Sequence, residues 1–312
     1  MTSAILTSPS VTVRAPAKVN LELRVGPPRP DGFHPLATVY QAVSLFDEVT
    51  VHAADEWSIE IGGSRALGVP ADETNLALRA ARLLAERHGV DGAVAIFIDK
   101  KIPVAGGMGG GSADAAATLV ACDWLWDLGL SKEDLADVAA ELGSDVPFLL
   151  FGGTALGTGR GEVITPVLTR GTYHWVFAPS DIGLSTPDVY RQFDEHNDAV
   201  GFAPAEPMSS STLMAALMSG DPERLAPVLQ NDLEGPAIDL RPELEEIIVE
   251  GRQLGALAGI VSGSGPTVAF LAAAHESAID LAVGLTATGV VSDTYRATGP
   301  VAGAIRSVPR VD

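Results

Sequence analysis

The stretch Pro103–Leu119, PVAGGMGGGSADAAATL, constrains the chain most, because five of the six residues from Gly106 to Gly111 are glycine. Residues without a Cβ let backbone N–H groups approach an anion closely and adopt the positive φ angles of an anion-binding nest. Ser112 is a good helix N-cap, and the alanine-rich run after it predicts a helix that stops at Gly129. The loop therefore presents a helix N-terminus, whose free N–H groups and dipole favour a phosphate chain.

Other glycine-rich loops fit this stretch poorly. A Walker A loop needs a Gly-Lys pair, and Ser112 stands where the lysine is required. The dinucleotide-binding fingerprint is matched only by Gly107 and Gly109, with Ser112 in the place of the third glycine. A nucleophile elbow around Ser112 needs glycine at position 114, which is Asp114. A flexible surface turn before an ordinary helix stays open as a structural alternative.

Composition limits the class of protein and its partners. With 312 residues, 46% of them hydrophobic, the chain can bury a substantial core in one large or two ordinary domains. The net charge of −20 argues against nucleic acid and anionic membranes as partners, although a local helix terminus, lysine or metal ion can still attract a nucleotide.

Cysteine, histidine and the N-terminal segment point to a cytoplasmic protein. Cys122 is the only cysteine, so no internal disulfide forms. The N-terminal residues lack the pattern of a signal peptide, and no stretch approaches a membrane span. The six histidines include no pair at metal-ligand spacing, which argues against a structural zinc site.

Alternating residues predict a strand from Val19 to Val25, in which apolar and polar side chains take opposite faces. Lys18 and Asn20 therefore project side by side. A solvated strand face is the alternative interpretation of this pattern.

Two connections carry side chains suited to a binding site. In the turn-rich segment Gly26–Leu36, Phe33 and His34 could stack on a flat ligand or pack as a loop anchor. Asp145 lies between a helix stop and the apolar run FLLFGG, where a partly desolvated carboxylate usually has a function or a partner. Its alternative role is that of N-cap for a turn that starts at Pro147.

Helices and strands alternate in both halves of the chain. Thr74-Asn75 opens a helix that ends at Gly89, and the strand Ala93–Ile98 leads into the glycine loop. Residues Ser131–Asp134 form a capping box for a helix that stops at Gly143, and Gly152–Gly161 is predicted to form a hairpin that closes the first domain. A new segment begins near Tyr173 and contains a second glycine and serine loop, Ser262–Thr267. We therefore predict two α/β or α+β domains, residues 1–171 and 172–312.

The Lys18 strand, the Pro103–Ala116 loop and the Ser262–Thr267 loop together resemble the three motifs of the GHMP small-molecule kinases. The resemblance spans nearly the whole chain, and within the family it is strongest to members that phosphorylate a cytidine diphosphate-linked polyol. The segments that match in order are APAKVNLEL, DGFH, TNLALRAARLL, PVAGGMGGGSADAA, LGSDVPFLL, STPDVY, QNDLE and SGSGPT.

The resemblance implies an α+β fold with the two-domain GHMP kinase architecture. The first domain would be an ATP-binding domain of the ribosomal protein S5 domain 2-like type. The second would be a substrate-binding ferredoxin-like α/β sandwich, with the site in the cleft between them.

The chain departs from the family pattern at three positions. Met108 stands where leucine is usual, a swap of similar volume. Ala113 replaces a frequent second serine, so only Ser112 is assigned to phosphate or metal. Phe33 replaces a frequent tyrosine, which preserves stacking but removes a phenol hydrogen bond.

The resemblance also implies the reaction and its residues. The γ-phosphoryl group of ATP passes to an alcohol, with Asp145 as the base, Lys18 beside it and Asn20 on the polyol. Mg²⁺ bridges the phosphate oxygens, and its direct protein ligands stay open, as does the oligomeric state. The ATP side is assigned to Pro103, Gly106, Gly107, Met108, Gly109, Gly110, Gly111, Ser112 and, near the adenine, Asn75. The substrate side is assigned to Asn20, Phe33, His34, Tyr190, Gly263, Ser264 and Gly265, the last three over the diphosphate or against the first loop.

Three other functions compete with this interpretation. A nicotinamide-dependent oxidoreductase would need the complete dinucleotide fingerprint, which is absent. A non-catalytic nucleotide-binding protein would not need Lys18 and Asp145. A GHMP kinase for homoserine or mevalonate remains the alternative, and the importance of the Phe33-His34 loop distinguishes it.

Overall fold

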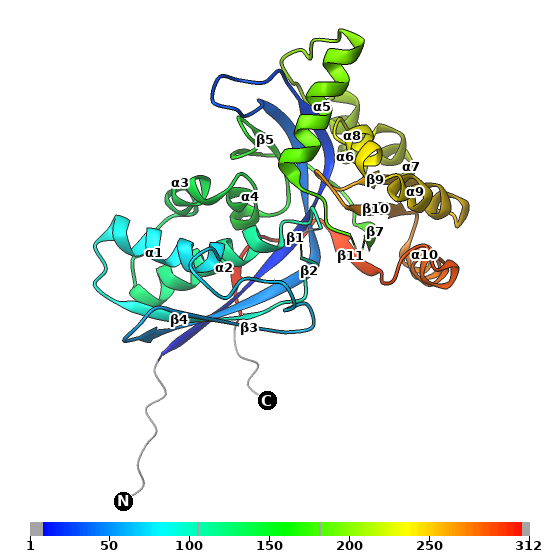
Figure 1. Cartoon of the computed structure of the whole chain (residues 1–312). Helices are drawn as coiled ribbons and strands as arrows, with labels where there is room; N and C mark the ends of the chain where they lie inside the picture. The colour runs from blue at the N-terminus through cyan, green and yellow to red at the C-terminus, as the bar shows by residue number, and fades with distance from the viewer. Residues whose placement is uncertain (1–8, 105, 181, 308–312) are drawn as a thin grey trace, which may run out of the picture.

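Two long antiparallel strands form the centre of the fold (Figure 1). The computed structural model describes residues 9–104, 106–180 and 182–307. β1 (Ser10–Val25) pairs with β2 (Leu36–Ala54) along its whole length, with two register shifts. The same sheet contains β3 (Ser58–Gly62), β4 (Ala93–Asp99), β5 (Thr154–Thr158), β6 (Val163–Pro166), β8 (Gln230–Asn231) and β12 (Ile305–Arg306).

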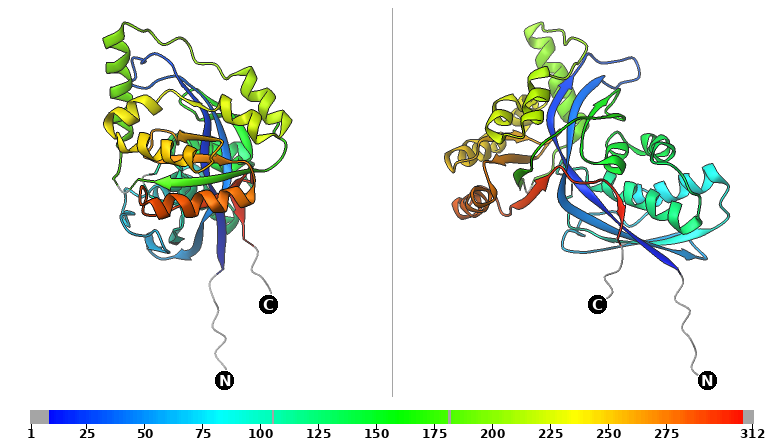
Figure 2. Two further views of the ribbon diagram at one scale, coloured as in Figure 1. Left: turned by 90° about the vertical axis from the view of Figure 1, so that its right-hand side faces the viewer. Right: turned by 180° about the vertical axis from the view of Figure 1, so that it is seen from behind.

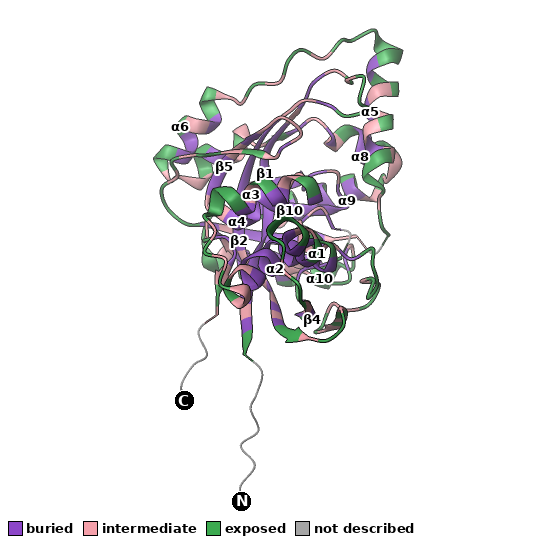
Figure 3. Ribbon diagram, turned by 90° about the vertical axis from the view of Figure 1, so that its left-hand side faces the viewer, coloured by how far each residue is buried: buried purple, intermediate pink, exposed green. Residues whose placement is uncertain are grey.

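Four helices cover one face of this first sheet. They are α1 (Leu76–His88), α2 (Gly110–Trp126), α3 (Lys132–Leu142) and α4 (Val146–Phe151). α2 packs on β1 and β2 and is buried without interruption over residues 113–122, because its run of alanines allows a close approach to its neighbours. Figure 3 shows this helix as the most buried of the group.

The second sheet has the order β11-β7-β10-β9, with antiparallel neighbours throughout. Its strands are β7 (Tyr173–Pro179), β9 (Ala258–Val261), β10 (Thr267–Ala272) and β11 (Tyr295–Gly299). The helices of this half are α5 (Thr186–Val200), α6 (Ser211–Ser219), α7 (Pro222–Leu225), α8 (Glu234–Leu240), α9 (Glu243–Gln253) and α10 (His275–Thr288), with a 3₁₀ turn at Ala226–Val228.

Alternate residues of the second sheet face two different hydrophobic clusters. Trp175 and Leu271 pack toward the first sheet and belong to the same cluster as α2. Val176 and Phe270 face the other way, toward α5, α8, α9 and α10. Those helices lie together on the outer side of the second sheet (Figures 1 and 2), so the two halves share one continuous core along β2.

Several helix ends follow the sequence signals. Asn75 caps α1 by accepting a hydrogen bond from the N–H of Ala77, and Gly89 ends the helix in the left-handed conformation. Ser131 and Asp134 form the reciprocal capping box that opens α3. These predictions are confirmed because each depends on a few neighbouring residues.

The helix after the glycine loop starts about one turn before its predicted start and ends slightly before its predicted end. Gly109, with φ of 75°, is the N-cap, so the helix starts at Gly110 and Ser112 lies in its first turn. At the other end Asp127 takes the left-handed conformation, and its N–H bonds to the carbonyl of Asp123. The helix therefore ends at Trp126, before Gly129.

The polar face of the first strand is buried, so the interpretation as a solvated face is wrong. The strand begins at Ser10, well before Val19. Lys18, Asn20 and Glu22 are 4%, 3% and 0% exposed. The second half of the molecule covers this face, a contact that local alternation cannot reveal.

The position predicted for the domain boundary, near residue 171, falls between β6 and β7 and so between the two sheets. Two short segments from beyond this position return to the first sheet: β8 pairs with β1 at Glu22 and Leu23, and β12 pairs with β1 at Val13 and Arg14. Within the described ranges, no helix is both long and apolar enough to cross a membrane.

Candidate active site

A pocket of about 630 Å³ lies where the two halves meet. This volume is typical of small-molecule sites. Eleven of the predicted site residues line it: Lys18, Asn20, Phe33, His34, Gly107, Gly109, Ser112, Asp145, Tyr190, Gly263 and Ser264. The pocket also contains residues that sequence reasoning missed, among them Tyr40, Arg160, Thr186, Arg191 and Asp194.

Lys18 and Asp145 form an ion pair in this pocket. The Nζ atom of Lys18 lies 3.4 Å from Oδ2 of Asp145 and donates a 2.6 Å hydrogen bond to Oδ1 of Asn20. Lys18 and Asn20 come together because they occupy alternate positions of β1. The Asn20 amide then donates to Oγ1 of Thr38, at 2.8 Å. The three predicted side chains are thus joined in one network.

Asp145 lies at the start of α4, but its carboxylate does not cap the helix. No cap hydrogen bond from this side chain occurs within the described chain. Instead, Oδ1 accepts a 3.0 Å hydrogen bond from the hydroxyl of Tyr40. The side chain is about one quarter exposed, so the carboxylate faces the pocket while its partners hold it. Asp145 therefore occupies the N-cap position of the backbone, but its side chain does not act as a cap.

The glycine loop arches over Lys18. The N–H of Lys18 donates to the carbonyl of Met108, and Met108 is buried in the core. Gly107 and Gly109 have φ of 68° and 75°, and a Cβ at Gly109 would lie 3.1 Å from Cγ of Lys18. Only glycine combines these backbone angles with such a close approach.

The remaining loop residues shape the loop from outside the pocket. Pro103, Gly106 and Met108 are buried beside it, Gly110 is the first residue of α2, and Gly111 is exposed. Asn75 lies apart from the pocket lining, and both polar atoms of its side chain have internal partners, Ala77 and Pro70. The adenine-side contact of Asn75 stays a prediction.

The second glycine and serine loop meets the first one. Gly263 and Ser264 line the pocket, whereas Gly265 lies behind them, outside the lining. The Asn231 amide donates to the carbonyls of Val261 and Gly263, at 2.8 and 2.7 Å, and so fixes the loop.

Aromatic side chains form the opposite end of the pocket. The rings of His34 and Tyr190 lie 5.2 Å apart, and Nδ1 of His34 donates to the carbonyl of Gly26. Phe33 is 51% exposed, and the Arg160 guanidinium lies 5.0 Å from its ring centre. Burial, with a smaller effect of Asp145, raises the pKa of the Tyr190 hydroxyl, so this group stays neutral. The aromatic rings thus provide flat, apolar surfaces with the charged side chain of Arg160 beside them.

The missed pocket residues carried weak sequence signals. Arg160 lies in the turn of the β5–β6 hairpin, which looked like a simple domain closure, and Arg191 directly follows Tyr190 on α5. Tyr40 lies in a strand whose residues are mostly apolar, where an aromatic residue is expected in the core.

A buried ionic cluster lies beneath the glycine loop. Nζ of Lys100 donates to Oδ2 of Asp47 and to Oδ2 of Asp114, at 2.5 and 2.6 Å, and all three side chains are buried. Oδ1 of Asp47 also accepts the N–H groups of Lys101 and Ile102. Oδ1 of Asp114 has no hydrogen-bond partner in the described part of the chain. Burial, opposed by Lys100, raises the pKa of Asp114 to about 8.

Comparison with known proteins agrees with this geometry. The family models for the GHMP kinases N-terminal and C-terminal domains match residues 75–153 and 213–290. A protein of a Nocardioides species, named 4-diphosphocytidyl-2-C-methyl-D-erythritol kinase, is 56% identical over 297 residues, covering 94% of this chain and 98% of the relative. A protein of the same name from Clavibacter michiganensis is 52% identical over 311 residues, covering 97% and 98%.

Solved structures support both the fold and the family. The crystal structure of a 4-(cytidine 5′-diphospho)-2C-methyl-D-erythritol kinase aligns with a TM-score of 0.74 at 34% identity, covering 92% of this chain and 98% of that one. Homoserine kinase from Cytophaga hutchinsonii aligns with a TM-score of 0.73 at 20% identity, covering 98% and 100%, which shows the fold alone. The predicted two-domain α+β architecture is confirmed. The chain belongs to the GHMP kinase family and, within it, to the group of 4-diphosphocytidyl-2-C-methyl-D-erythritol kinases.

Proposed function

We propose that this protein transfers the γ-phosphoryl group of ATP to the 2-hydroxyl of 4-diphosphocytidyl-2-C-methyl-D-erythritol, giving the 2-phosphate and ADP in the non-mevalonate isoprenoid pathway. The observation that carries the proposal is the Lys18–Asp145 ion pair, which lies between the glycine loop and the aromatic end of one pocket. A base, a cation, a phosphate cradle and a surface for a flat ring are the parts that such a reaction needs.

Asp145 is the general base of the proposed reaction. Its carboxylate accepts the proton of the substrate 2-hydroxyl as the oxygen forms a bond to the γ-phosphorus, and the bond from that phosphorus to the bridging oxygen breaks to release ADP. Lys18 pairs with the carboxylate and offsets negative charge on the transferring group. Asn20 hydrogen-bonds the methylerythritol portion beside them.

The glycine loop and the start of α2 bind the triphosphate. Gly107, Gly109 and Ser112 face the pocket at the positive end of the helix dipole. No group of three or more metal-ligating side chains occurs in the residues that the structure describes, which fits an ion that arrives with ATP, because Mg²⁺ usually keeps waters and phosphate ligands. When bound, the ion would neutralise phosphate charge, with the Ser112 hydroxyl as its protein contact.

The aromatic end of the pocket binds the cytidine. Phe33 and Tyr190 offer faces for stacking, and the ring of His34, the next residue after Phe33, lies 5.2 Å from the ring of Tyr190. Gly263 and Ser264 lie within reach of the diphosphate that joins the two ends of the substrate. Both partners are thus small molecules, and we place the reaction in the cytoplasm, consistent with a single buried cysteine.

The test is ADP release by the purified protein with Mg-ATP and, in separate reactions, the cytidyl substrate, homoserine and mevalonate. We expect turnover with the cytidyl substrate alone and a large but measurable fall of its kcat in Asp145→Asn. Turnover with another alcohol would support the assignment as a kinase but overturn the assignment of the substrate. Unchanged activity of Asp145→Asn would overturn the role of Asp145 as the base.

A further inference from the structure

The hydroxyl of Tyr40 holds one oxygen of the Asp145 carboxylate, and Lys18 holds the other. The Tyr40 hydroxyl donates to Oδ1 at 3.0 Å, and Nζ of Lys18 lies 3.4 Å from Oδ2. We propose that Tyr40 is a positioning residue that fixes the plane of the Asp145 carboxylate for proton acceptance. This inference rests on the role of Asp145 in the proposed function.

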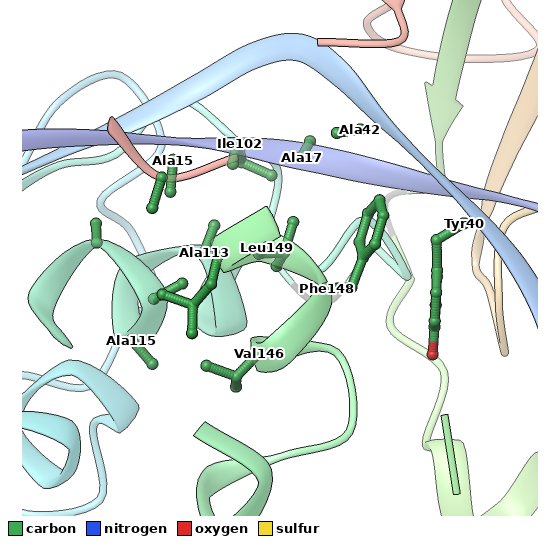
Figure 4. Close-up of a cluster of buried hydrophobic side chains, with 14 of the residues drawn as sticks. Ala15, Ala17, Tyr40, Ala42, Ile102, Ala113, Ala115, Val146, Phe148 and Leu149 are labelled. Atoms are coloured by element: carbon green, nitrogen blue, oxygen red, sulfur yellow. The ribbon is translucent and has the colours of Figure 1, made fainter. Parts of the chain in front are cut away.

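The position of the Tyr40 hydroxyl is fixed by packing. The ring is 2% exposed and stacks on Phe148, with ring centres 4.9 Å apart. Figure 4 shows the two rings side by side, with the Tyr40 oxygen pointing away from the strand that carries it. A Cβ at Gly157 would lie only 2.6 Å from the ring, and Gly161 packs against the hydroxyl. The glycines of the β5–β6 hairpin therefore make room for a tyrosine in this orientation.

Asp145 needs such a partner because its own helix does not fix it. The carboxylate makes no cap hydrogen bond to α4 within the described residues, and the torsion that turns a carboxylate is broad. With Lys18 alone, the group could rotate about the ion pair. The hydrogen bond from Tyr40 removes that freedom and determines which lone pairs face the pocket.

Tyr40 acts as a neutral donor and not as a second base. Burial and, next, the charge of Asp145 raise the pKa of its hydroxyl well above the ordinary value of 10.0. The proton therefore stays on Tyr40, and its hydroxyl remains a hydrogen-bond donor to Oδ1 of Asp145. Its contribution is orientation, which matters because a displacement of about 1 Å at a reacting group can cost roughly 10²-fold in rate.

The test is the variant Tyr40→Phe, which removes one oxygen and retains the stacked ring. We expect kcat to fall roughly 10- to 100-fold while KM for both substrates stays within about twofold. Tyr173→Phe is the matched control, because Tyr173 is a buried tyrosine outside the pocket whose hydroxyl has no hydrogen-bond partner among the described residues. The control should keep the wild-type kcat and melting temperature.

A double-mutant cycle separates positioning from general stability. If Tyr40 acts through Asp145, adding Tyr40→Phe to Asp145→Asn should lower kcat no further. Additive losses, an unchanged kcat in Tyr40→Phe, or a rise in KM alone would overturn the proposal. The cycle is measured with whichever alcohol the wild type phosphorylates, so a wrong substrate assignment does not affect it.

Crystal structures provide a readout that does not depend on turnover. In Tyr40→Phe we expect the Asp145 carboxylate to rotate or to occupy two orientations, with Oδ2 no longer facing Lys18 as it does now. An unchanged carboxylate in the variant would overturn the proposal even if the wild type phosphorylated none of the three alcohols.

Discussion

Ser262 donates a 3.1 Å hydrogen bond from its side chain to the carbonyl of Gly107, and so joins two loops that lie 155 positions apart in the sequence. Ser262 is fully buried, and its own N–H bonds to the carbonyl of Thr267. The shape of the glycine loop therefore depends on a residue of the second half. This contact is a direct link between the proposed ATP site and the second half of the fold.

Replacing Ser262 by alanine should weaken ATP binding. The loss of one buried hydrogen bond, worth about 1 kcal/mol, would raise KM for ATP about fivefold. Steady-state kinetics measure this, with Ser219→Ala as the control, since Ser219 also donates to a backbone carbonyl but lies on α6. Equal KM values for ATP in the wild type and Ser262→Ala would show that the bond between the loops does not shape the site.

Replacing Thr38 by valine should weaken binding of the alcohol substrate but not of ATP. Thr38 accepts from the amide of Asn20 and donates to the carbonyl of Glu22, each at 2.8 Å, so its hydroxyl fixes the orientation of Asn20. We expect KM for the alcohol to rise about fivefold, because the lost hydrogen bond contributes roughly 1 kcal/mol. Thr50→Val on the same strand is the control, because Thr50 lies far from the pocket lining. A rise in KM for ATP instead would contradict the assignment of Asn20 to the alcohol.

Replacing Phe33 by alanine distinguishes a cytidyl substrate from a simple alcohol. Stacking of a base on an aromatic ring is worth about 1–3 kcal/mol, so KM for the cytidyl substrate should rise about tenfold or more. KM for ATP should not change, and the partly exposed Phe97 on β4 provides the control variant Phe97→Ala. Kinetics indistinguishable from wild type would argue that the base does not stack on Phe33.

Replacing Asp114 by asparagine should flatten the dependence of stability on pH. Burial raises the pKa of Asp114 from 3.8 to about 8, so between these values the folded chain binds a proton that the unfolded chain has lost. The contribution of Asp114 to the free energy of unfolding is therefore fully present below pH 3.8 and is lost as pH rises toward 8. The slope of the free energy of unfolding against pH that this one group produces is at most about 1.4 kcal/mol per pH unit.

Urea unfolding at pH 5 and pH 8 measures this difference. The wild type should lose more free energy of unfolding between the two values than Asp114→Asn does. The comparison variant is Asp47→Asn, because the Asp47 carboxylate accepts from Lys100 and from two backbone N–H groups. Breaking that buried ion pair should destabilise the fold by about 3–5 kcal/mol at both pH values. If the free energy of unfolding changed equally with pH in the wild type and in Asp114→Asn, this would contradict a protonated Asp114 in the folded chain.

The features that could be predicted from sequence are local or belong to a recurrent motif. The Asn75 cap, the Ser131 capping box and the glycine loop each depend on residues within one or two turns of chain. The association of Lys18 with Asp145 was predictable only through the resemblance to a family. Periodicity alone indicated two mixed domains and no site.

The features that could not be predicted depend on contacts between distant segments. The burial of Glu22 comes from the second half of the chain, where the N–H of Ser210 donates to its carboxylate. The partnership of Tyr40 with Asp145 depends on the packing of α4 and of the β5–β6 hairpin. Periodicity and capping rules describe neighbours in sequence and contain no information on such contacts.

The pairing of β1 with segments from the last third of the chain also affects the order of folding during synthesis. β1 leaves the ribosome long before β8 and β12, so the edge that these segments occupy lacks its partners until both segments have been synthesised. An unpaired edge can pair with other chains, and Lys18 and Asn20 lie between the two stretches that stay open. The strand that carries Lys18 thus gains its last partners only after residues 305–306 are made, which couples assembly of the proposed active site to synthesis of the second half of the fold.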